Sequence, residues 1–512
     1  MTIPPTKAQI DAALGAPAAA NTLLDDIRKT VTDPSVIYPE MFGAPEVSRD
    51  NLPAHDPSTT VASDTTACVA ALANLRDRGG TLLLRRKYGI NAGLTLEGTR
   101  ESTKDGLRIA GTGPYTTGFH MTANGFNCLL IRGLDPSSGR RPFHCSVENL
   151  GITGGSGTGK GIFVQGGSST HTDISNGYFG RLYINTGDTG IHLSKCFQLT
   201  LHLIKAGSAK GHAFSLQGGN TTHLLGCYAM AAGDGFAGYR IIAGSPVTML
   251  ACTGVDEPGC SWAALGSMAN VAGTTRSGST TSMVKLGTAH TEPTGFFDMC
   301  QIKITSGALD GAEVRISRYV GGADPTAYLS THTPLASSPA SGVTYNISDG
   351  DSQFSQAGTP YAKDPRITIQ DCNLESFSRT GIKTYRAGLL TIQNALFFLD
   401  PSVSPTHDCC VYLNEAITNY TVKMVASRFD LTPRNAGYPA EFIQGKGDKP
   451  MMMVERVDSS PSYRTIHSME TGTALRMRHD DPYDITLPTG FPTSNPGAGR
   501  LWSNGGILTV GT

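Results

Sequence analysis

The chain has 512 residues, of which 41 are basic and 42 acidic, so its formal net charge is −1. A balance this even excludes the basic footprint of a protein that binds nucleic acid or anionic lipid. Glycine contributes 61 residues and charged side chains 16 %, against usual shares of about 7 % and about 25 %. No window approaches the ~18 consecutive apolar residues of a membrane-spanning helix, so we expect no membrane insertion.

Residues 1–40 predict a short helical segment that stands apart from the rest of the chain. Asn21 can cap a helix whose apolar positions share one face, and Pro34 ends it. An amphipathic helix detached from a large β region needs a surface on which to bury its apolar face. We therefore expect residues 1–40 to anchor the chain to a partner protein, the alternative being a helix that packs back on its own domain.

A second helix is predicted over residues 63–78, with Ser63 or Asp64 as its N-cap and Gly79 at its end. Beyond this helix, helical periodicity nearly vanishes. Short apolar runs alternate with Gly, Ser, Asn, Thr and Asp turns as far as about residue 430.

These runs repeat. A glycine followed by a short strand recurs at Gly161, Gly190, Gly211, Gly238 and Gly381. Cysteines recur beside them at Cys196, Cys227, Cys252 and Cys372. An irregular period of roughly 20 to 30 residues without helices indicates a β-solenoid, an all-β fold. Like residues of stacked coils lie ~4.8 Å apart, so we expect the cysteines to form an inward ladder. A β-sandwich is the competing fold, but hairpin signals are rare here.

The period breaks over residues 265–360, between two joints rich in Ser, Thr and Gly. Stronger alternating strands such as QIKITSG and AEVRISRYVG lie between these joints. We expect a small antiparallel β module inserted into one turn of the solenoid, which a loop tip tolerates. The solenoid then comprises residues 41–264 and 361–430, and the last segment, 431–512, loses the period.

Four segments resemble the opening of pectate-lyase-like right-handed parallel β-helices, especially those of phage tailspikes. They are MFGA at 41–44, SDTTACVAAL, GGTLLLRRKYGI, and LRIAGTG at 107–113. The insert and the ending NPGAGRLWSNGGILTV are similar to segments of phage tail proteins. One departure is that the Gly-Asp-Gly usual soon after FGA is missing.

The resemblance implies a homotrimer carried on a virion, assembled in the bacterial cytoplasm, that recognises and often cleaves bacterial surface polysaccharide. Residues 1–40 would then attach to a phage tail or baseplate protein, and residues 431–512 would trimerise. Nothing in the sequence calls for a cofactor, and the thirteen histidines form no cluster at metal-ligand spacing.

Carboxylates are scarce, so their placement is informative. A glycosidase needs two, about 5–5.5 Å apart if retaining and about 6.5–9.5 Å apart if inverting, and neighbouring coils at ~4.8 Å meet either requirement. If the insert is looped out, the coil that carries Asp256 and Glu257 becomes the neighbour of the coil that carries Asp371 and Glu375. We expect Glu375 to be the general acid and Asp256 or Glu257 the nucleophile or base.

Each of these acids could instead be an ordinary solvated turn residue. The second-rank candidates are Asp173, Asp188 and Asp234. Tyr228 and Trp262 could stack on sugar rings, or else pack in the core. The sequence leaves three activities open: glycosidic hydrolysis, binding as an adhesin without cleavage, and polysaccharide lysis with a Lys or His base.

Overall fold

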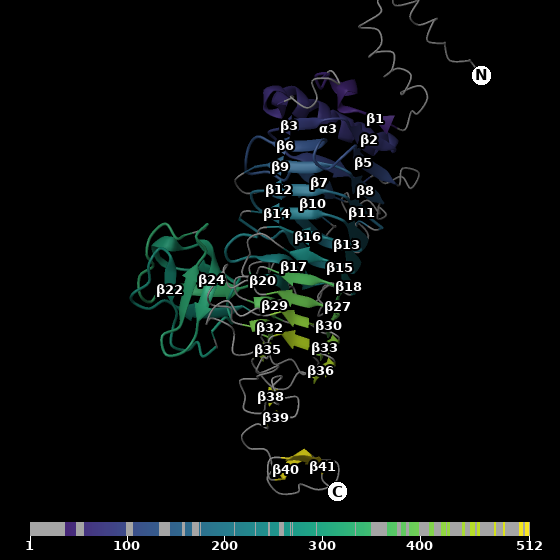
Figure 1. Cartoon of the computed structure of the whole chain (residues 1–512). Coiled ribbons are helices and arrows are strands. Elements are labelled where there is room, and N and C mark those ends of the chain that lie inside the picture. Colours follow the sequence, from purple (N-terminus) through teal and green to yellow (C-terminus); the bar gives the residue numbers. More distant parts are fainter. Residues whose placement is uncertain are drawn as a thin grey trace, which may run out of the picture. The chain divides into compact units, whose positions relative to one another are not determined.

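The computed structural model divides into two compact units, Met1–Ile184 and Asn185–Thr512 (Figure 1). It describes residues 36–47, 56–98, 106–132, 144–155, 159–165, 174, 176–208, 210–230, 232–243, 246–254, 261–266, 268, 270–292, 294–332, 334–349, 366–375, 380–385 and 389–398, and beyond these the backbone of strands between Cys409 and Val510. The predicted helix within residues 1–35 lies outside the described residues. In the described part of the chain, no helix is both long and apolar enough to cross a membrane.

The first unit is built from parallel strands in two sheets. One sheet holds β1 (Val36–Ile37), β2 (Thr81–Leu84), β4 (Leu94–Glu97), β5 (Leu107–Gly111), β7 (Leu129–Arg132), β8 (Cys145–Glu148), β10 (Ile162–Gln165) and β11 (Tyr178–Gly180). The other holds β3 (Lys87–Ile90), β6 (Gly118–Met121) and β9 (Gly151–Gly154), and β12 (Tyr183–Thr186) follows. Pairing in register stacks Leu82 on Ile109 and Ile109 on Val147, all fully buried.

A helical cap precedes these coils. It consists of η1 (Pro39–Phe42), η3 (Pro57–Thr60) and α3 (Val61–Arg78), and Gly79 ends α3 in the left-handed region at φ 77°. The predicted helix is confirmed, but its predicted cap is wrong because Thr60 is the N-cap residue. Asp64 is instead fully buried, and it forms an ion pair of 2.7 Å with Arg86.

The second unit repeats the parallel arrangement. Its longer sheet holds β13 (Ile191–His202), β15 (Phe214–Leu225), β17 (Ala237–Ala243), β18 (Val247–Leu250), β20 (Ser261–Leu265), β27 (Arg366–Gln370), β29 (Thr380–Thr384), β30 (Leu389–Gln393), β32 (Cys409–Leu413), β33 (Thr421–Val425), β35 (Ile443–Gly445) and β36 (Met451–Glu455). Its shorter sheet holds β14 (Lys205–Ser208), β16 (Tyr228–Ala229), β19 (Thr253–Gly254), β28 (Asn373–Glu375), β31 (Leu396–Phe398), β34 (Arg428–Asp430) and β37 (Asp458–Ser460).

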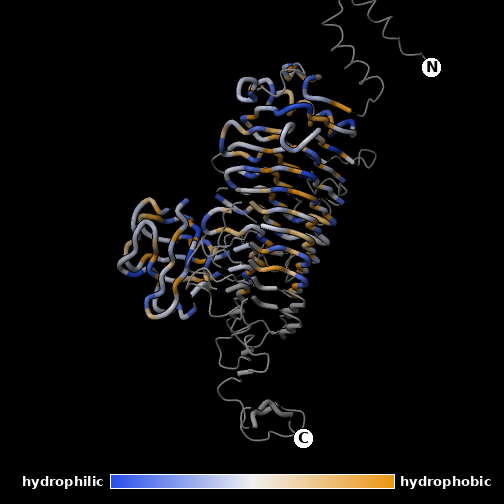
Figure 2. The backbone as a smooth tube through the Cα atoms, viewed as in Figure 1, coloured by the Kyte–Doolittle hydropathy of each residue, from blue (hydrophilic) through white to orange (hydrophobic). Residues whose placement is uncertain are grey.

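The fold is a parallel β-helix, as the repeat predicts. In Figure 2, hydrophobic stretches recur from coil to coil. Parallel pairing continues past residue 430, where we expected the coils to end, because β36 pairs with β33 and β37 with β34. Two antiparallel hairpins follow, formed by β38 (Arg476–Met477) with β39 (Ile485–Thr486) and by β40 (Leu501–Asn504) with β41 (Ile507–Val510).

The inserted module is a six-stranded antiparallel sheet that lies beside the coils in Figure 1. Its strands are β21 (Val271–Thr274), β22 (Met283–Lys285), β23 (Gln301–Ile304), β24 (Glu313–Val320), β25 (Thr326–Leu329) and β26 (Thr344–Ser348), with the turn η6 (Gly307–Leu309) before β24. The coil before the insert and the coil after it are direct neighbours, because Val247 of β18 pairs in parallel with Ile367 of β27. The insert is therefore looped out of one turn of the β-helix, as the sequence predicts.

Buried polar side chains fasten this insert to the coils. Lys383 of β29 is 1 % exposed, and its Nζ donates to the carbonyls of Phe296 at 2.9 Å and Asp298 at 3.2 Å. The Tyr385 hydroxyl donates to the same Asp298 carbonyl at 2.5 Å. The guanidinium of Arg240 lies 3.7 Å from the carboxylate of Asp349, and both side chains are buried. The insert thus docks on the coils through specific buried contacts.

The predicted cysteine ladder forms for three of its four members. Cys227, Cys252 and Cys372 each precede a paired strand of the shorter sheet, and all three are buried and free. Cys196 is also buried, but it lies on β13 opposite Gly219 and belongs to another column. The reason is that β13 and β15 are long strands, so a cysteine inside β13 does not reach the turn position that the other three share.

Candidate functional site

The coils that flank the insert carry most of the acids singled out in the sequence. Thr253 of β19 pairs with Asn373 of β28, and Gly254 pairs with Leu374. The two coils are therefore direct neighbours, which is the condition for their carboxylates to meet. Asp256 and Glu257 follow β19 and lie outside the described residues, and Glu375 is described through its backbone in β28 alone.

Asp371 occupies the tight turn between β27 and β28, in the left-handed region at φ 52°. Its side chain is exposed, as predicted, and its carboxylate accepts hydrogen bonds from Nδ2 of Asn394 at 2.6 Å and Nε2 of Gln370 at 3.3 Å. Asn394 holds the equivalent turn position of the next coil, at φ 48°. Two side-chain amides thus orient this carboxylate and link consecutive turns.

Tyr228 lies on the outer face of the shorter sheet. It is half-buried and stands in register between Lys205 of β14 and Thr253 of β19, with Asn373 one coil further. The Lys205 ammonium is 4.9 Å from the centre of the tyrosine ring. These four outward side chains form a row of one aromatic and three polar groups, spaced by about 4.8 Å per coil.

Trp262 does not belong to this face, and its predicted role in sugar stacking is wrong. It is 3 % exposed, and its ring centre lies 4.7 Å from that of the buried Tyr239. Glycine at position 254 makes room for it, since a Cβ there would lie 2.8 Å from Cδ1 of the indole. The indole therefore fills the inside of the coil.

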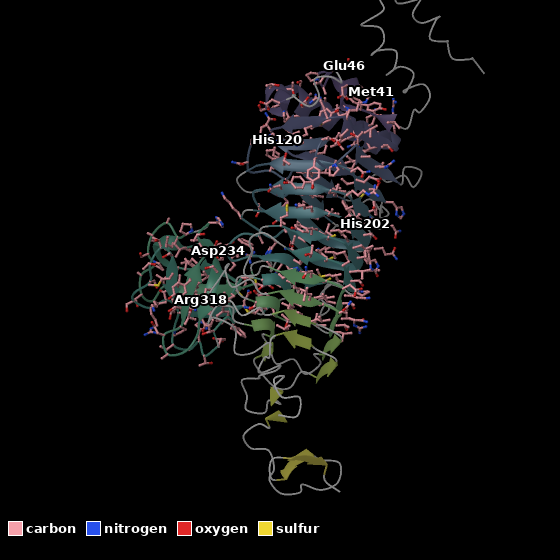
Figure 3. The ribbon with its side chains drawn as sticks, viewed as in Figure 1. Met41, Glu46, His120, His202, Asp234 and Arg318 are labelled. Carbon is pink, nitrogen blue, oxygen red and sulfur yellow. The ribbon has the colours of Figure 1, made fainter. Side chains whose placement is uncertain are left out.

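Two of the three second-rank acids, Asp188 and Asp234, lie among the described residues. Asp234 lies where the coils meet the insert (Figure 3), and its Oδ2 accepts from the backbone N–H of Thr331 at 3.1 Å. Asp188 is half-buried in a turn before β13. Asp173 lies outside the described residues. Asp234 thus has a contact that fixes the insert.

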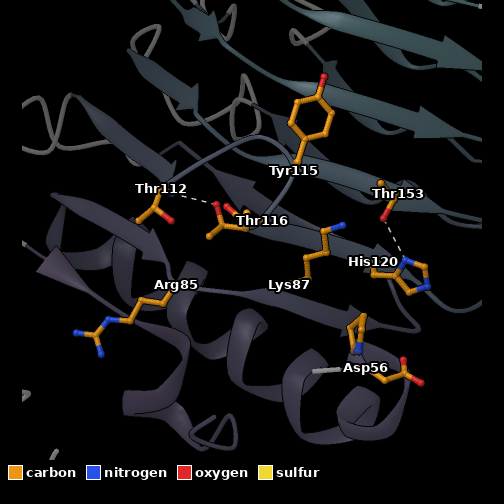
Figure 4. A pocket seen from close by; sticks show the side chains of 10 residues that line it. Asp56, Arg85, Lys87, Thr112, Tyr115, Thr116, His120 and Thr153 are labelled. Carbon is orange, nitrogen blue, oxygen red and sulfur yellow. Dashed lines mark hydrogen bonds between the residues drawn. The ribbon is translucent and has the colours of Figure 1, made fainter. Parts of the chain in front are cut away.

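A hollow of about 720 Å³ in the first unit was missed by the sequence reasoning (Figure 4). Its floor is the outer face of β3, β6 and β9, where Lys87 pairs with Gly118 and His120 pairs with both Gly89 and Thr153. These residues are far apart in the chain and meet only through the strand register, so neither composition nor local spacing could reveal them.

Two surface segments wall this hollow. The turn η3 lies directly on β3, because a Cβ on Gly89 would come within 1.9 Å of the Pro57 carbonyl oxygen. On the other side, Thr117 Oγ1 accepts from the Thr112 N–H at 3.0 Å and so holds a loop that presents Tyr115. The Tyr115 ring is 4.9 Å from that of Tyr183, yet the residue is 60 % exposed.

The electrostatics of the hollow centre on His120. Its Nδ1 is 3.1 Å from Oγ1 of Thr153. Burial, followed by the charge of Lys87, lowers the pKa of His120 below its usual 6.5, while Asp56 opposes the shift. At neutral pH the imidazole is therefore uncharged and can both donate and accept a hydrogen bond.

Across the described residues, no group of three or more His, Cys, Asp or Glu side chains is placed to hold a metal ion. No family model and no curated protein matches the chain. Solved structures do resemble it, and phage tailspikes and a mannuronan epimerase are among them.

ORF18 of Geobacillus virus E2 matches with a TM-score of 0.40 and 10 % identity, over 96 % of this chain and 71 % of that one. The A-module of the Azotobacter vinelandii mannuronan C-5 epimerase AlgE6 matches with a TM-score of 0.44 and 13 % identity, over 83 % and 99 %. The gp42 tailspike of Acinetobacter phage vb_AbaP_AS12 matches with a TM-score of 0.36 and 10 % identity, over 91 % and 67 %. At these values no residue role transfers to this chain.

Proposed function

We propose that this chain is a phage tailspike that binds a bacterial surface polysaccharide and cleaves it by glycosidic hydrolysis where the insert leaves the coils. The observation that carries the proposal is the parallel pairing of β28 on β19 across the looped-out insert. That pairing brings two short acid-bearing segments to neighbouring coils in a chain with few acids. Paired carboxylates on adjacent coils have the spacing that glycosidic hydrolysis needs.

In this proposal Glu375 is the general acid, and Asp256 or Glu257 is the nucleophile or base. Asp371 is the fourth carboxylate of the cluster, held by the amides of Asn394 and Gln370. Carboxylates gathered at one site disfavour each other's ionisation, so one of them retains a proton that it can transfer to the leaving sugar oxygen.

The row on the shorter sheet supports polymer binding beside this cluster. A rigid solenoid presents an extended surface on which successive sugar units can lie. Tyr228 offers an aromatic ring in that row, and Thr253 offers a hydroxyl that can bond sugar hydroxyls. Asn373 is the first residue of β28 and Glu375 the last, so the row leads to the strand that carries the proposed acid.

The quaternary and virion roles are part of the same proposal. The protein would act as a homotrimer, with residues 431–512 in trimer contacts and residues 1–40 attached to a tail or baseplate protein. Light scattering measures the mass of the assembly in solution. A monomeric mass would contradict the proposed trimer. A chain lacking residues 1–35 should remain a folded trimer that no longer joins virions, and its failure to fold would contradict the assigned anchor.

The decisive experiment is product analysis after incubation of the purified protein with capsule or lipopolysaccharide from the host bacterium. Hydrolysis gives saturated oligosaccharides, which mass spectrometry identifies. Unsaturated products that absorb ultraviolet light would instead mean a lyase. Retention of the polysaccharide without any products would mean an adhesin.

A further inference from the structure

The hollow of the first unit has a built architecture that the proposed hydrolytic site does not use. Three neighbouring strands, β3, β6 and β9, form its floor. The turn η3 forms one wall, and the loop held by Thr117 forms the other. Its volume of about 720 Å³ lies within the ~300–1,000 Å³ typical of sites for small ligands. The hollow is therefore large enough for one or two sugar units.

The charged groups around the hollow favour an anion. Lys87 contributes a cation and Asp56 an anion, whereas the Arg85 guanidinium stacks on Tyr38, 3.8 Å from the centre of its ring. Lys87 is half-buried whereas Asp56 is exposed, so the ammonium is less screened by water than the carboxylate.

The uncharged groups favour a sugar. Tyr115 presents an exposed ring with an apolar face and a hydroxyl, which suits the mixed surface of a pyranose. Thr116 and Thr153 place hydroxyls on two sides of the hollow. His120, uncharged at neutral pH, adds a group that accepts as well as donates, and a sugar hydroxyl can match both roles.

We infer that this hollow binds a carboxylate-bearing sugar unit, with Lys87 as the partner of the carboxylate and Tyr115 as the stacking platform. The inference rests on the proposed function, because it takes the ligand to be part of the bound polysaccharide. It adds that this polysaccharide is acidic, and that the first unit holds it at a place separate in sequence from the proposed catalytic segment.

Saturation-transfer NMR with the purified full chain tests the inference. The probes are glucuronate and galacturonate at millimolar concentration, each compared with its neutral counterpart, glucose or galactose. At least one uronate should give a signal at least threefold stronger than that of its neutral counterpart. Lys87→Gln and Tyr115→Ala should each reduce that signal at least fivefold.

Two matched variants control for charge and for loss of an aromatic ring. Lys210→Gln removes an exposed lysine of the second unit, and Tyr328→Ala removes an exposed tyrosine of the insert. Both should leave the uronate signal unchanged. A melting temperature equal to that of the parent shows that Lys87→Gln and Tyr115→Ala are folded.

The inference is overturned if both uronates bind no better than glucose and galactose, or if the Lys87→Gln and Tyr115→Ala chains bind the uronate like the parent. The proposed function is tested separately. It fails if the protein neither retains nor cleaves the polysaccharide of the host. A protein that cleaves a polysaccharide free of acidic sugars would overturn this inference while leaving the proposed function intact.

Discussion

The backbone N–H of Cys252 donates to the Sγ atom of Cys372 at 3.3 Å, although 120 residues separate them in the chain. This contact exists because the whole insert leaves one coil and the next coil closes directly behind it. The Cys372 thiol in turn donates to the carbonyl of Met249 at 3.5 Å. The two coils that flank the insert are thus joined by buried thiols. The small size and weak polarity of a thiol suit a stack of side chains inside the coils.

These thiols should be inert in the folded protein. A hydrogen bond from Cys252 and burial raise the pKa of Cys372, and burial raises the pKa of Cys145 to about 12. Only the thiolate reacts with alkylating reagents. Peptide mapping after iodoacetamide treatment at pH 8 should find Cys145, Cys252 and Cys372 unmodified, and all three modified in guanidinium chloride. Labelling of Cys252 or Cys372 in the native state would contradict the assigned column.

The buried ion pair under the cap should contribute strongly to stability. Asp64 accepts from Arg86 at 2.7 and 2.9 Å and from the N–H of Gly89 at 3.0 Å. Asp64→Asn removes the carboxylate that neutralises Arg86 at 2.7 Å, and the Glu40 carboxylate lies further away, at 3.8 Å from Nε. We expect the free energy of unfolding of the first unit to fall by about 3 kcal/mol, the lower end for breaking a buried pair, as measured by urea denaturation.

The control for this variant is Asp77→Asn, which breaks the solvent-exposed pair of Asp77 with Arg76. A surface ion pair contributes about 0–1 kcal/mol to the free energy of unfolding. An Asp64→Asn loss no larger than that of the control would show that the cap does not depend on the buried pair.

Sequence reasoning predicted the β-helix and the looped-out insert because both depend on features local to the chain: short apolar runs, glycine turns and a break in their period. It failed where a side chain's direction depends on neighbouring coils. Trp262 points inward because Gly254, in the strand β19, leaves space for its ring. The hollow around His120 was missed for the same reason, since His120 and Thr153 become neighbours only through the register of β6 and β9.

Lys383 should control how firmly the insert is docked. Its ammonium donates to the insert carbonyls of Gly295, Phe296 and Asp298. Lys383→Met keeps the bulk of the side chain but leaves these buried carbonyls without that donor, at a cost of about 1–3 kcal/mol. Limited proteolysis should therefore cut within residues 266–365 roughly tenfold faster than in the parent, while the coils resist.

Lys303→Met is the matched control, because Lys303 is exposed on the insert and pairs with Glu313 at 2.8 Å. It should leave the cleavage rate of the insert unchanged. Equal rates for the Lys383→Met chain and the parent would mean that the joints alone hold the insert in place.

His120 should titrate below its ordinary pKa of 6.5. Burial is the main cause and Lys87 adds to it, whereas Asp56 opposes it. Because the folded state favours the neutral imidazole, this group's contribution to stability is full above pH 6.5 and is lost as pH falls through the lowered pKa. NMR titration of the His120 ring should show Lys87→Gln raising the pKa toward 6.5 and Asp56→Asn lowering it further. A pKa above 6.5 in the parent would contradict this description of the hollow.

Glu375→Gln tests the proposed acid most directly. The substitution keeps the shape of the side chain and removes the proton that would be transferred to the leaving oxygen. The rate of polysaccharide cleavage should fall at least ~10²-fold, the lower end of what a positioned proton donor contributes. Trimer mass and polysaccharide binding should persist. Glu313→Gln, on the exposed face of the insert, is the control and should cleave at the parental rate. If Glu375→Gln also cleaves at that rate, the acid lies elsewhere, and Asp173 and Asp234 are the next carboxylates to replace.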